Sequence, residues 1–177
     1  MTVENGQHFA VGLPGFGFIG RSGTLKVATG EAPWYLDITD RVAKFIQEAG
    51  VLMGMAVVFS KHTTAAIMVN EKESLLLQDV TRLMERVAPR DGQYFHDDFE
   101  MRTENMTDEE TPNAHAHLKH WLLGSSEAIP VIAGRLALGQ WQRIFLVELD
   151  KPREREVVFQ VMGFSGFKLE VEKGVVT

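Results

Sequence analysis

The spacing of hydrophobic positions predicts strands at both ends of the chain and helices between them. Runs with the length or the alternation of strands cover residues 25–28, 34–38, 53–60, 65–69, 128–132, 141–148, 155–163 and 167–172. Only residues 61–64 separate the runs 53–60 and 65–69. These two runs are therefore expected to form a hairpin or to lie as neighbouring strands.

Two segments in the first half of the chain carry helical spacing. A short helix is expected to begin at Thr39 or Asp40, either of which can cap it, and to be ended by Gly50. Residues 74–87 form a second helical stretch with its apolar residues on one face. Pro89 prevents this helix from continuing.

A third helix is expected after the long polar stretch of residues 90–110. Thr111 can cap it, Pro112 suits its first position and Gly124 can end it. A connection as long as 90–110 is either functional or mobile. Because helices lie in the middle and strands at both ends, without regular alternation, the predicted fold is α+β: a two-layer antiparallel β-sandwich with two or three helices.

A single domain over residues 1–177 is expected, because no linker or repeat divides the chain. The glycine-rich residues 6–30 are expected to form turns that join short edge strands. Within them, GLPGFGFIG could cradle a phosphate or form a loop or edge hairpin. Its spacing matches neither a dinucleotide fingerprint nor a P-loop, which favours the loop or hairpin.

Composition restricts the functions that the chain can have. Its 177 residues are 45% hydrophobic and 24% charged, the balance of a globular domain. No segment resembles a secretory signal or approaches the ~20 apolar residues of a membrane span, so a cytoplasmic protein is expected. The net charge of −6 argues against nucleic-acid binding, which depends on neutralising phosphates. Without cysteine, any metal must be held by histidine or oxygen ligands.

Histidines supply most of the candidate chemistry. His62 lies in KHTTA between two predicted strands, and His96 lies in YFHDD, where carboxylates can orient its ring or bind a cation. In NAHAHLKH, helical spacing places Asn113 and His117 on one side of the helix and His115 roughly opposite. His117 is therefore the better site candidate, and His115 is the better structural one.

Two arrangements of these histidines are open. His62, His96 and His117 could meet at a divalent metal, zinc or magnesium, that keeps an open coordination position. No HExxH or similar close pair of ligands is present to decide for a metal. A pocket without metal, in which a histidine transfers protons, is equally compatible with the sequence.

Polar residues near strand ends are candidates for binding a substrate. Asn70 and Glu71 close a predicted strand, although they could equally cap the following helix. Arg153 and Arg155 project from the same side of an extended segment and could hold an anion by forked hydrogen bonds. Salt bridges to the nearby carboxylates of residues 148–154 are the structural alternative for both arginines.

Several separated motifs resemble one known family. In chain order, HTTAAIMVNE, YFHDD, NAHAHLKHWLLGSSEAIPV and GRLALGQWQRIFLVELDKPRER resemble the YjbQ-like family, also called the secondary thiamine-phosphate synthase enzyme family. The resemblance covers residues 62–163. It implies a β-sandwich with helices, assembled as a homotrimer, whose pocket lies near subunit contacts.

The resemblance also assigns residues by motif. The site positions that it implies are His62, Thr63, Asn70, Glu71, His96, Asn113, His117, Gln142, Arg153 and Arg155. We expect catalytic roles for His62, His96, His117 and Asn113, with the three histidines also as the metal ligands, and substrate binding by the others. The sequence departs from a common form of the pattern at His115, where Asp often stands. Residues 1–30 match the family poorly and look like an extension.

The implied reaction joins a pyrimidine diphosphate to a thiazole phosphate and expels diphosphate. Such a reaction requires stabilisation of a leaving anion, which Arg153, Arg155 and a divalent cation could provide. The leading hypothesis is a metal-assisted enzyme acting on a small phosphorylated or heteroaromatic substrate. The alternatives are a trimeric protein that binds a small anion without catalysis, and a metal-dependent hydrolase that uses His62, His96 and His117.

Overall fold

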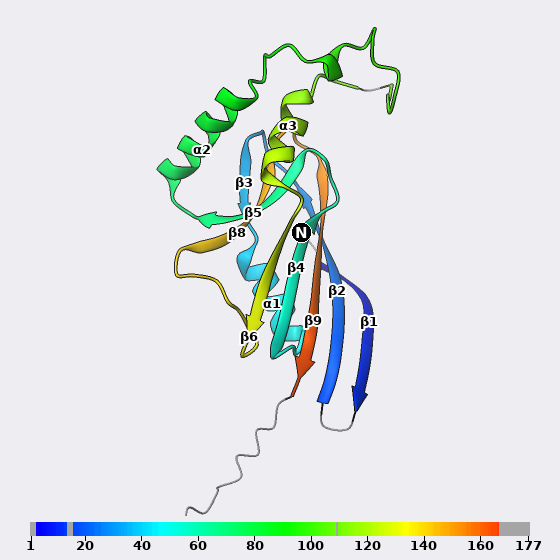
Figure 1. The fold of residues 1–177 in the computed structure, drawn as a ribbon, viewed down its shortest axis with the longest axis vertical. Coiled ribbons are helices and arrows are strands. Elements are labelled where there is room, and N and C mark those ends of the chain that lie inside the picture. The colour runs from blue at the N-terminus through cyan, green and yellow to red at the C-terminus, as the bar shows by residue number, and fades with distance from the viewer. Residues whose placement is uncertain (1–2, 14–15, 109, 167–177) are drawn as a thin grey trace, which may run out of the picture.

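The computed structural model describes residues 3–13, 16–108 and 110–166, which form two antiparallel sheets and three α-helices (Figure 1). The larger sheet has, in spatial order, β1 (Val3–Leu13), β2 (Phe16–Ala28), β9 (Glu154–Ser165), β4 (Met53–Ser60), β6 (Ser126–Ile132) and β7 (Arg135–Leu136). The smaller sheet has β3 (Trp34–Asp37), β8 (Gln142–Glu148) and β5 (Ala65–Glu71). The helices are α1 (Thr39–Ala49), α2 (Ser74–Val87), α3 (Ala114–Leu123) and the short 3-10 helix η1 (Phe95–Asp97). The predicted α+β fold of two antiparallel sheets with helices is confirmed.

One hydrophobic core joins the two sheets and α1. It contains Leu25 of β2, Phe45 of α1, Val58 of β4, Leu146 of β8 and Phe159 of β9, all nearly inaccessible to solvent. Each buried side chain of this size contributes about 1.5–3 kcal/mol by leaving water. The core therefore packs the inner face of the larger sheet against α1 and the smaller sheet.

A second apolar layer lies on the other face of the smaller sheet. Phe145 and Val147 of β8 and Ala66 of β5 pack there with Ala116 of α3. This packing lays α3 across the sheet, and α2 lies beside it in Figure 1. The polar stretch of residues 90–110 connects α2 to α3 and rises beyond the end of both helices.

Two of the predicted helices are confirmed. α1 begins at Thr39, but its N-cap is Ile38, so the expected cap by Thr39 or Asp40 is wrong. Gly50 ends the helix with a φ of 73°, a left-handed conformation that glycine adopts without strain. α2 spans the predicted residues, and its last turn is followed by Ala88 and Pro89. Sequence periodicity was sufficient here because each helix has an amphipathic face and a residue that stops it.

The expected pairing of residues 53–60 with 65–69 is wrong. β4 pairs with β6 on one side and β9 on the other, so neither edge of β4 is open to β5. β5 pairs instead with β8 in the smaller sheet. The connection between β4 and β5 crosses from one sheet to the other and carries His62 and Thr63 over the end of the core.

The N-terminal region forms longer strands than expected. β1 and β2 form an antiparallel pair, and β2 also pairs with β9 from Gly17 to Ala28. Because β2 has a partner on both sides, its glycines are held in extended backbone rather than in turns. Residues 14–15 of GLPGFGFIG and the expected strand 167–172 lie outside the described residues.

Candidate functional site

Asp97 connects the polar loop to the start of α3. Its Oδ1 accepts hydrogen bonds from the backbone N–H groups of Asn113 and Ala114, at 2.9 and 3.0 Å. The expectation that α3 starts at Pro112 under a Thr111 cap is wrong, because the helix starts at Ala114, whose N–H group is capped by Asp97. The Thr111 hydroxyl instead accepts a hydrogen bond from Lys151 Nζ at 3.0 Å.

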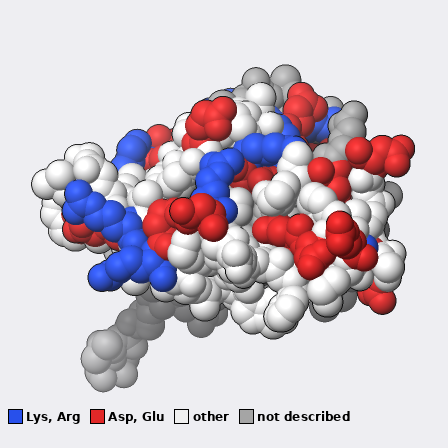
Figure 2. Space-filling view, turned by 90° about the horizontal axis from the view of Figure 1, so that it is seen from above, with Lys and Arg blue, Asp and Glu red and all other residues white. Residues whose placement is uncertain are grey.

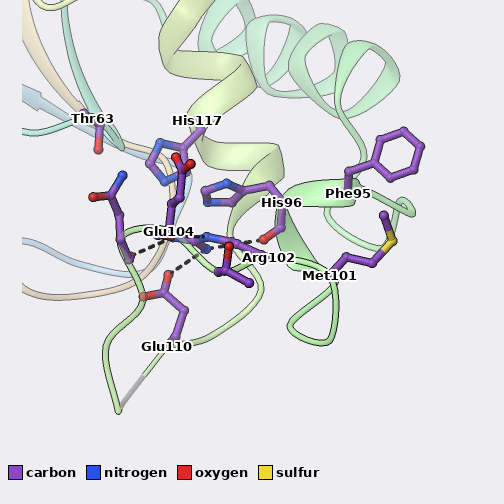
Figure 3. A pocket seen from close by; sticks show the side chains of 10 residues that line it. Thr63, Phe95, His96, Met101, Arg102, Glu104, Glu110 and His117 are labelled. Carbon is purple, nitrogen blue, oxygen red and sulfur yellow. Dashed lines mark hydrogen bonds and ion pairs between the residues drawn. The ribbon is translucent and has the colours of Figure 1, made fainter.

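This connection places His96 against His117. The two ring centroids are 4.8 Å apart and the rings meet edge to face at 65° (Figure 3). Nε2 of His96 is buried and has no hydrogen-bond partner among the described residues. The structure thus brings together two of the three predicted histidines and leaves one imidazole nitrogen without a partner.

The histidine pair opens into a cavity of about 840 Å³. This volume lies within the range of small-molecule sites. The cavity is lined by one predicted residue, Thr63, besides the two histidines, and by residues of the polar loop: Phe95, Met101, Arg102, Thr103, Glu104, Asn105 and Glu110. Sequence reasoning named none of these loop residues as site residues. The only signal for them was the unusual length and polarity of the stretch itself.

Arg102 holds the loop in its folded path. Its guanidinium donates to the backbone oxygens of His96 at 3.3 Å, Glu104 at 3.2 Å and Asn105 at 2.9 Å, and pairs with the Glu110 carboxylate at 3.4 Å. These bonds engage Nε and both terminal nitrogens of Arg102 within the protein. Arg102 therefore gives the cavity its positive charge and its shape, while Glu104 and Glu110 add negative charge.

The surroundings of His117 favour its neutral form. Burial lowers the pKa of His117, and the nearby His96 and Arg102 lower it further, while Asp150 acts in the opposite sense. At neutral pH the His117 ring therefore keeps a nitrogen lone pair. Such a ring can accept a proton or bind a metal ion.

His62 does not line this cavity. Its Nε2 accepts a hydrogen bond from the backbone N–H of Glu156 at 2.7 Å. Burial, followed by the charge of Arg155, lowers the pKa of His62.

Within the part of the chain that the structure describes, no three His, Asp or Glu side chains are arranged to hold a metal ion. A metal in this cavity would rest on His96 and His117, with water, a rim carboxylate or the substrate completing its coordination.

The two predicted anion-binding arginines are both in ion pairs. Arg155 is 3% exposed and contacts Glu148 through Nε at 2.7 Å and through a terminal nitrogen at 2.6 Å. Burial acts to raise the pKa of Glu148, but hydrogen bonds from Arg155 and Thr29 outweigh it, so the pKa is lowered overall. Arg153 pairs with the buried carboxylate of Asp150. Both arginines therefore form salt bridges within the chain, which was the structural alternative to anion binding.

Three other predicted residues lie at the far end of the smaller sheet. Asn70 accepts a hydrogen bond from the Glu71 N–H at 2.8 Å, and Gln142 accepts one from the Gly139 N–H at 2.7 Å. Glu71 and Gln142 face each other across β5 and β8. The length of β5, about 20 Å at ~3.3 Å per residue, separates this group from Thr63.

Two buried residues at the start of α3 have polar atoms without a partner in the described part of the chain. Asn113 is 9% exposed, and its side-chain oxygen has no partner among the described residues. His115 is 2% exposed, and neither of its ring nitrogens has a partner in the same part of the chain. Neither residue lines the His96–His117 cavity, and only Asn113 was predicted to act in catalysis.

Comparison with known proteins decides the family. The sequence profile described as UPF0047 protein YjbQ-like matches residues 23–164, which is most of the chain. The chain belongs to the YjbQ-like UPF0047 family. A UPF0047 protein of Methanothermobacter thermautotrophicus is 40% identical over 139 residues, which are 78% of this chain and 90% of the relative.

Solved structures of the YjbQ-like family have the same fold. A YbjQ-like protein of unknown function from Sulfolobus solfataricus P2 is 33% identical, with a TM-score of 0.74 over 82% of this chain and 99% of the other. An uncharacterised YjbQ/UPF0047 protein from Clostridium acetobutylicum is 37% identical, with a TM-score of 0.68 over 78% and 98% of the two chains. The predicted family is therefore confirmed. No helix within the described ranges is long and apolar enough to cross a bilayer.

Proposed function

We propose that the chain is a metal-assisted enzyme that acts on a small phosphorylated or heteroaromatic substrate in the His96–His117 cavity. The observation that carries the proposal is the contact between the two imidazoles, together with the unpartnered Nε2 of His96. A buried polar group without a partner costs about 1–3 kcal/mol, so a ligand that supplies the missing contact is favoured there.

The charges around the cavity support the participation of a cation. Glu104 and Glu110 are acidic, and the guanidinium of Arg102 is already bonded within the loop. Figure 2, which looks onto this end of the molecule, shows acidic and basic side chains interspersed. Because Arg102 pairs with Glu110, the Glu104 carboxylate is the negative charge that would repel an anionic substrate unless a further cation offset it. His96 and His117 would hold that cation, which when bound supplies the positive charge that stabilises a leaving anion.

Apolar side chains at the mouth suit a planar ring. Phe95 is 85% exposed and Met101 is 65% exposed, and both line the cavity. Aromatic faces and thioether sulfur both make favourable contacts with aromatic rings. These two side chains can hold a heteroaromatic body while its charged end lies near the imidazoles.

The first reaction to assay is the synthesis of thiamine phosphate. The thiazole ring nitrogen would donate its electron pair to the methylene carbon of the pyrimidine, and the bond from that carbon to the diphosphate oxygen would break. The diphosphate would leave with the electron pair of that bond. In this reaction the chain has to orient two rings and stabilise the departing charge, and it needs no strong nucleophile.

The test compares His117→Ala with His120→Ala in assays that contain Mg²⁺ or Zn²⁺. His120 lies on the same helix, but its ring bonds the Ser125 hydroxyl at 3.0 Å and does not line the cavity. His117→Ala is expected to lower turnover by about 10²-fold or more without loss of fold, and His120→Ala to keep it. Unchanged turnover in His117→Ala would refute the role of His117. Binding of both substrates without any product would favour a protein that only captures a small anion.

We also propose that the chain assembles as a homotrimer, the state that the family resemblance implies. The outer face of the larger sheet supports self-association, because its large apolar side chains are 43–59% exposed: Phe18, Met53, Met55, Phe59, Ile132 and Phe164. Strand register makes the patch continuous, since Met53 pairs with both Ile132 and Phe164. Contiguous apolar patches of this kind mark interaction surfaces.

A further inference from the structure

A second, smaller cavity lies between α2, α3 and the start of β3. It has a volume of about 200 Å³ and shares no lining residue with the His96–His117 cavity. His115 lines it, is 2% exposed, and has both ring nitrogens buried without a partner among the described residues. A neutral imidazole always has one N–H donor and one acceptor, so the cavity contains an unused donor in either tautomer.

The charged side chains that line this cavity leave one positive charge in excess, and the Asp150 carboxylate that also acts on His115 is paired with Arg153. Lys119 of α3 and Glu85 of α2 form an ion pair, and both line the cavity. The carboxylate of Glu85 also accepts the backbone N–H of Arg90 at 3.1 Å. Arg90, an exposed residue, lines the cavity as well, and the described part of the chain offers its guanidinium no hydrogen-bond or ion-pair partner.

The rest of the lining is apolar or already paired. Pro33, Met84 and Leu149 provide hydrophobic surface, and the hydroxyls of Tyr35 and Thr81 lie 3.1 Å apart and bond each other. The volume corresponds to roughly six water molecules at about 30 Å³ each, which admits a compound with a short carbon chain. The cavity therefore combines one free cation and one free imidazole donor with an apolar wall.

We propose that this cavity binds a small monocarboxylate with a short apolar body. The carboxylate would accept hydrogen bonds from the Arg90 guanidinium and the His115 ring, and the carbon chain would contact Met84 and Leu149. Planar forked donors such as guanidinium match the two oxygens of a carboxylate. A metal ion is a poorer occupant, because Lys119 and Arg90 bring two positive charges and only Glu85 and His115 could be ligands.

The experiment is calorimetric titration of the full chain with sodium butyrate at constant ionic strength, with butyramide as the uncharged probe. Four variants are compared with the wild type: Arg90→Gln, His115→Phe, His117→Asn and, as a control that removes the same charge from α2 outside the cavity, Arg86→Gln. Circular dichroism confirms that each variant is folded. Arg90→Gln leaves the buried residues intact, so it tests the proposal even if His115→Phe fails to fold.

Butyrate is expected to bind and butyramide not to bind. Arg90→Gln and His115→Phe should each weaken butyrate binding by at least about tenfold, while Arg86→Gln and His117→Asn should leave it unchanged. The proposal is overturned if the wild type gives no binding, or if butyrate binds equally well to Arg90→Gln. Loss of binding in His117→Asn alone would place the anion in the other cavity and would also overturn it. The test does not depend on turnover, so its failure is separate from failure of the proposed enzyme activity.

Discussion

Asp97 accepts hydrogen bonds from the backbone N–H groups of Asn113 and Ala114, although it precedes them by 16 and 17 residues. Its neighbour His96 contacts His117, one turn into the helix that Asp97 caps. The same loop thus caps the start of α3 and supplies half of the imidazole pair. The arrangement of the candidate site is therefore expected to depend on this cap.

Removal of the cap should loosen the first turn of α3. Asp97→Ala is expected to lower the free energy of unfolding by about 1 kcal/mol, the usual cost of losing a capping side chain. Amide hydrogen exchange should speed up at Asn113 and Ala114 in particular. Chemical denaturation and exchange measured by NMR check both effects.

Asp91→Ala is the matched control, because Asp91 belongs to the same polar loop but makes no hydrogen bond to α3. It should change neither the stability nor the exchange rates. If both alanine variants behave alike, the loss reflects the charge of the loop, and the capping account fails.

The buried pair of Glu148 and Arg155 should be important for folding. Glu148 is fully buried, so Glu148→Gln leaves the Arg155 charge without its carboxylate partner and is expected to cost about 3–5 kcal/mol. The exposed neighbour Glu154, changed to Gln, should have almost no effect. Urea denaturation measures both variants. A cost below about 1 kcal/mol for Glu148→Gln would mean that water reaches the pair.

Acid should destabilise the chain partly through Asp37. Burial acts to raise the pKa of Asp37, but hydrogen bonds from Thr39, Arg143 and Lys72 outweigh it and lower the pKa to about 2. A carboxyl with a depressed pKa stabilises the fold above its unfolded pKa of about 3.9, and this stability is lost as the pH falls through about 2. Asp37→Asn should therefore cost about 1–2 kcal/mol at neutral pH and flatten the fall in stability between about pH 5 and pH 2.

Asp40→Asn is the control for this pH dependence. Asp40 also pairs with Arg143, at 2.9 Å, but its side chain is 88% exposed. An exposed pair contributes less than about 1 kcal/mol. Denaturation curves at several pH values should separate the two variants, and identical curves would show that Asp37 is not the residue responsible.

The apolar outer face of the larger sheet should be covered in the assembled protein. Met55→Glu places a charge in the middle of that face and is expected to convert a trimer into monomers. Leu75→Glu makes the same kind of change on α2, where Leu75 is 66% exposed, and should leave the trimer intact. Analytical ultracentrifugation distinguishes these states. A wild type that is monomeric at micromolar concentration would contradict the assembly.

Local sequence patterns predicted where the helices lie better than they predicted which strands pair. α1 and α2 could be located because apolar spacing and a stopping residue agree within each segment. The pairing of β5 with β8 could not be inferred, because it joins segments that are distant in sequence and depends on which edges are free. The start of α3 was misplaced for the same reason, since its cap comes from Asp97 and not from Thr111.

The candidate site was predicted only in part. His96, His117 and Thr63 were named from the sequence and do line one cavity, whereas His62 bonds the backbone of Glu156. Arg102 was missed, because its role is to bond backbone oxygens of its own loop, which leaves no residue pattern in the sequence. The family motifs supplied the candidate histidines, and the packing of α3 determined which of them meet.

The central claim is that His96 and His117 form one cation-binding site. Calorimetric titration of the purified chain with Zn²⁺ tests it most directly, with His96→Asn, His117→Asn and His120→Asn compared under the same conditions. We expect about one Zn²⁺ per chain, an affinity at least about tenfold weaker in His96→Asn and in His117→Asn, and wild-type affinity in His120→Asn. The claim would be contradicted if the wild type did not bind Zn²⁺. It would also be contradicted if loss of either His96 or His117 left Zn²⁺ affinity unchanged.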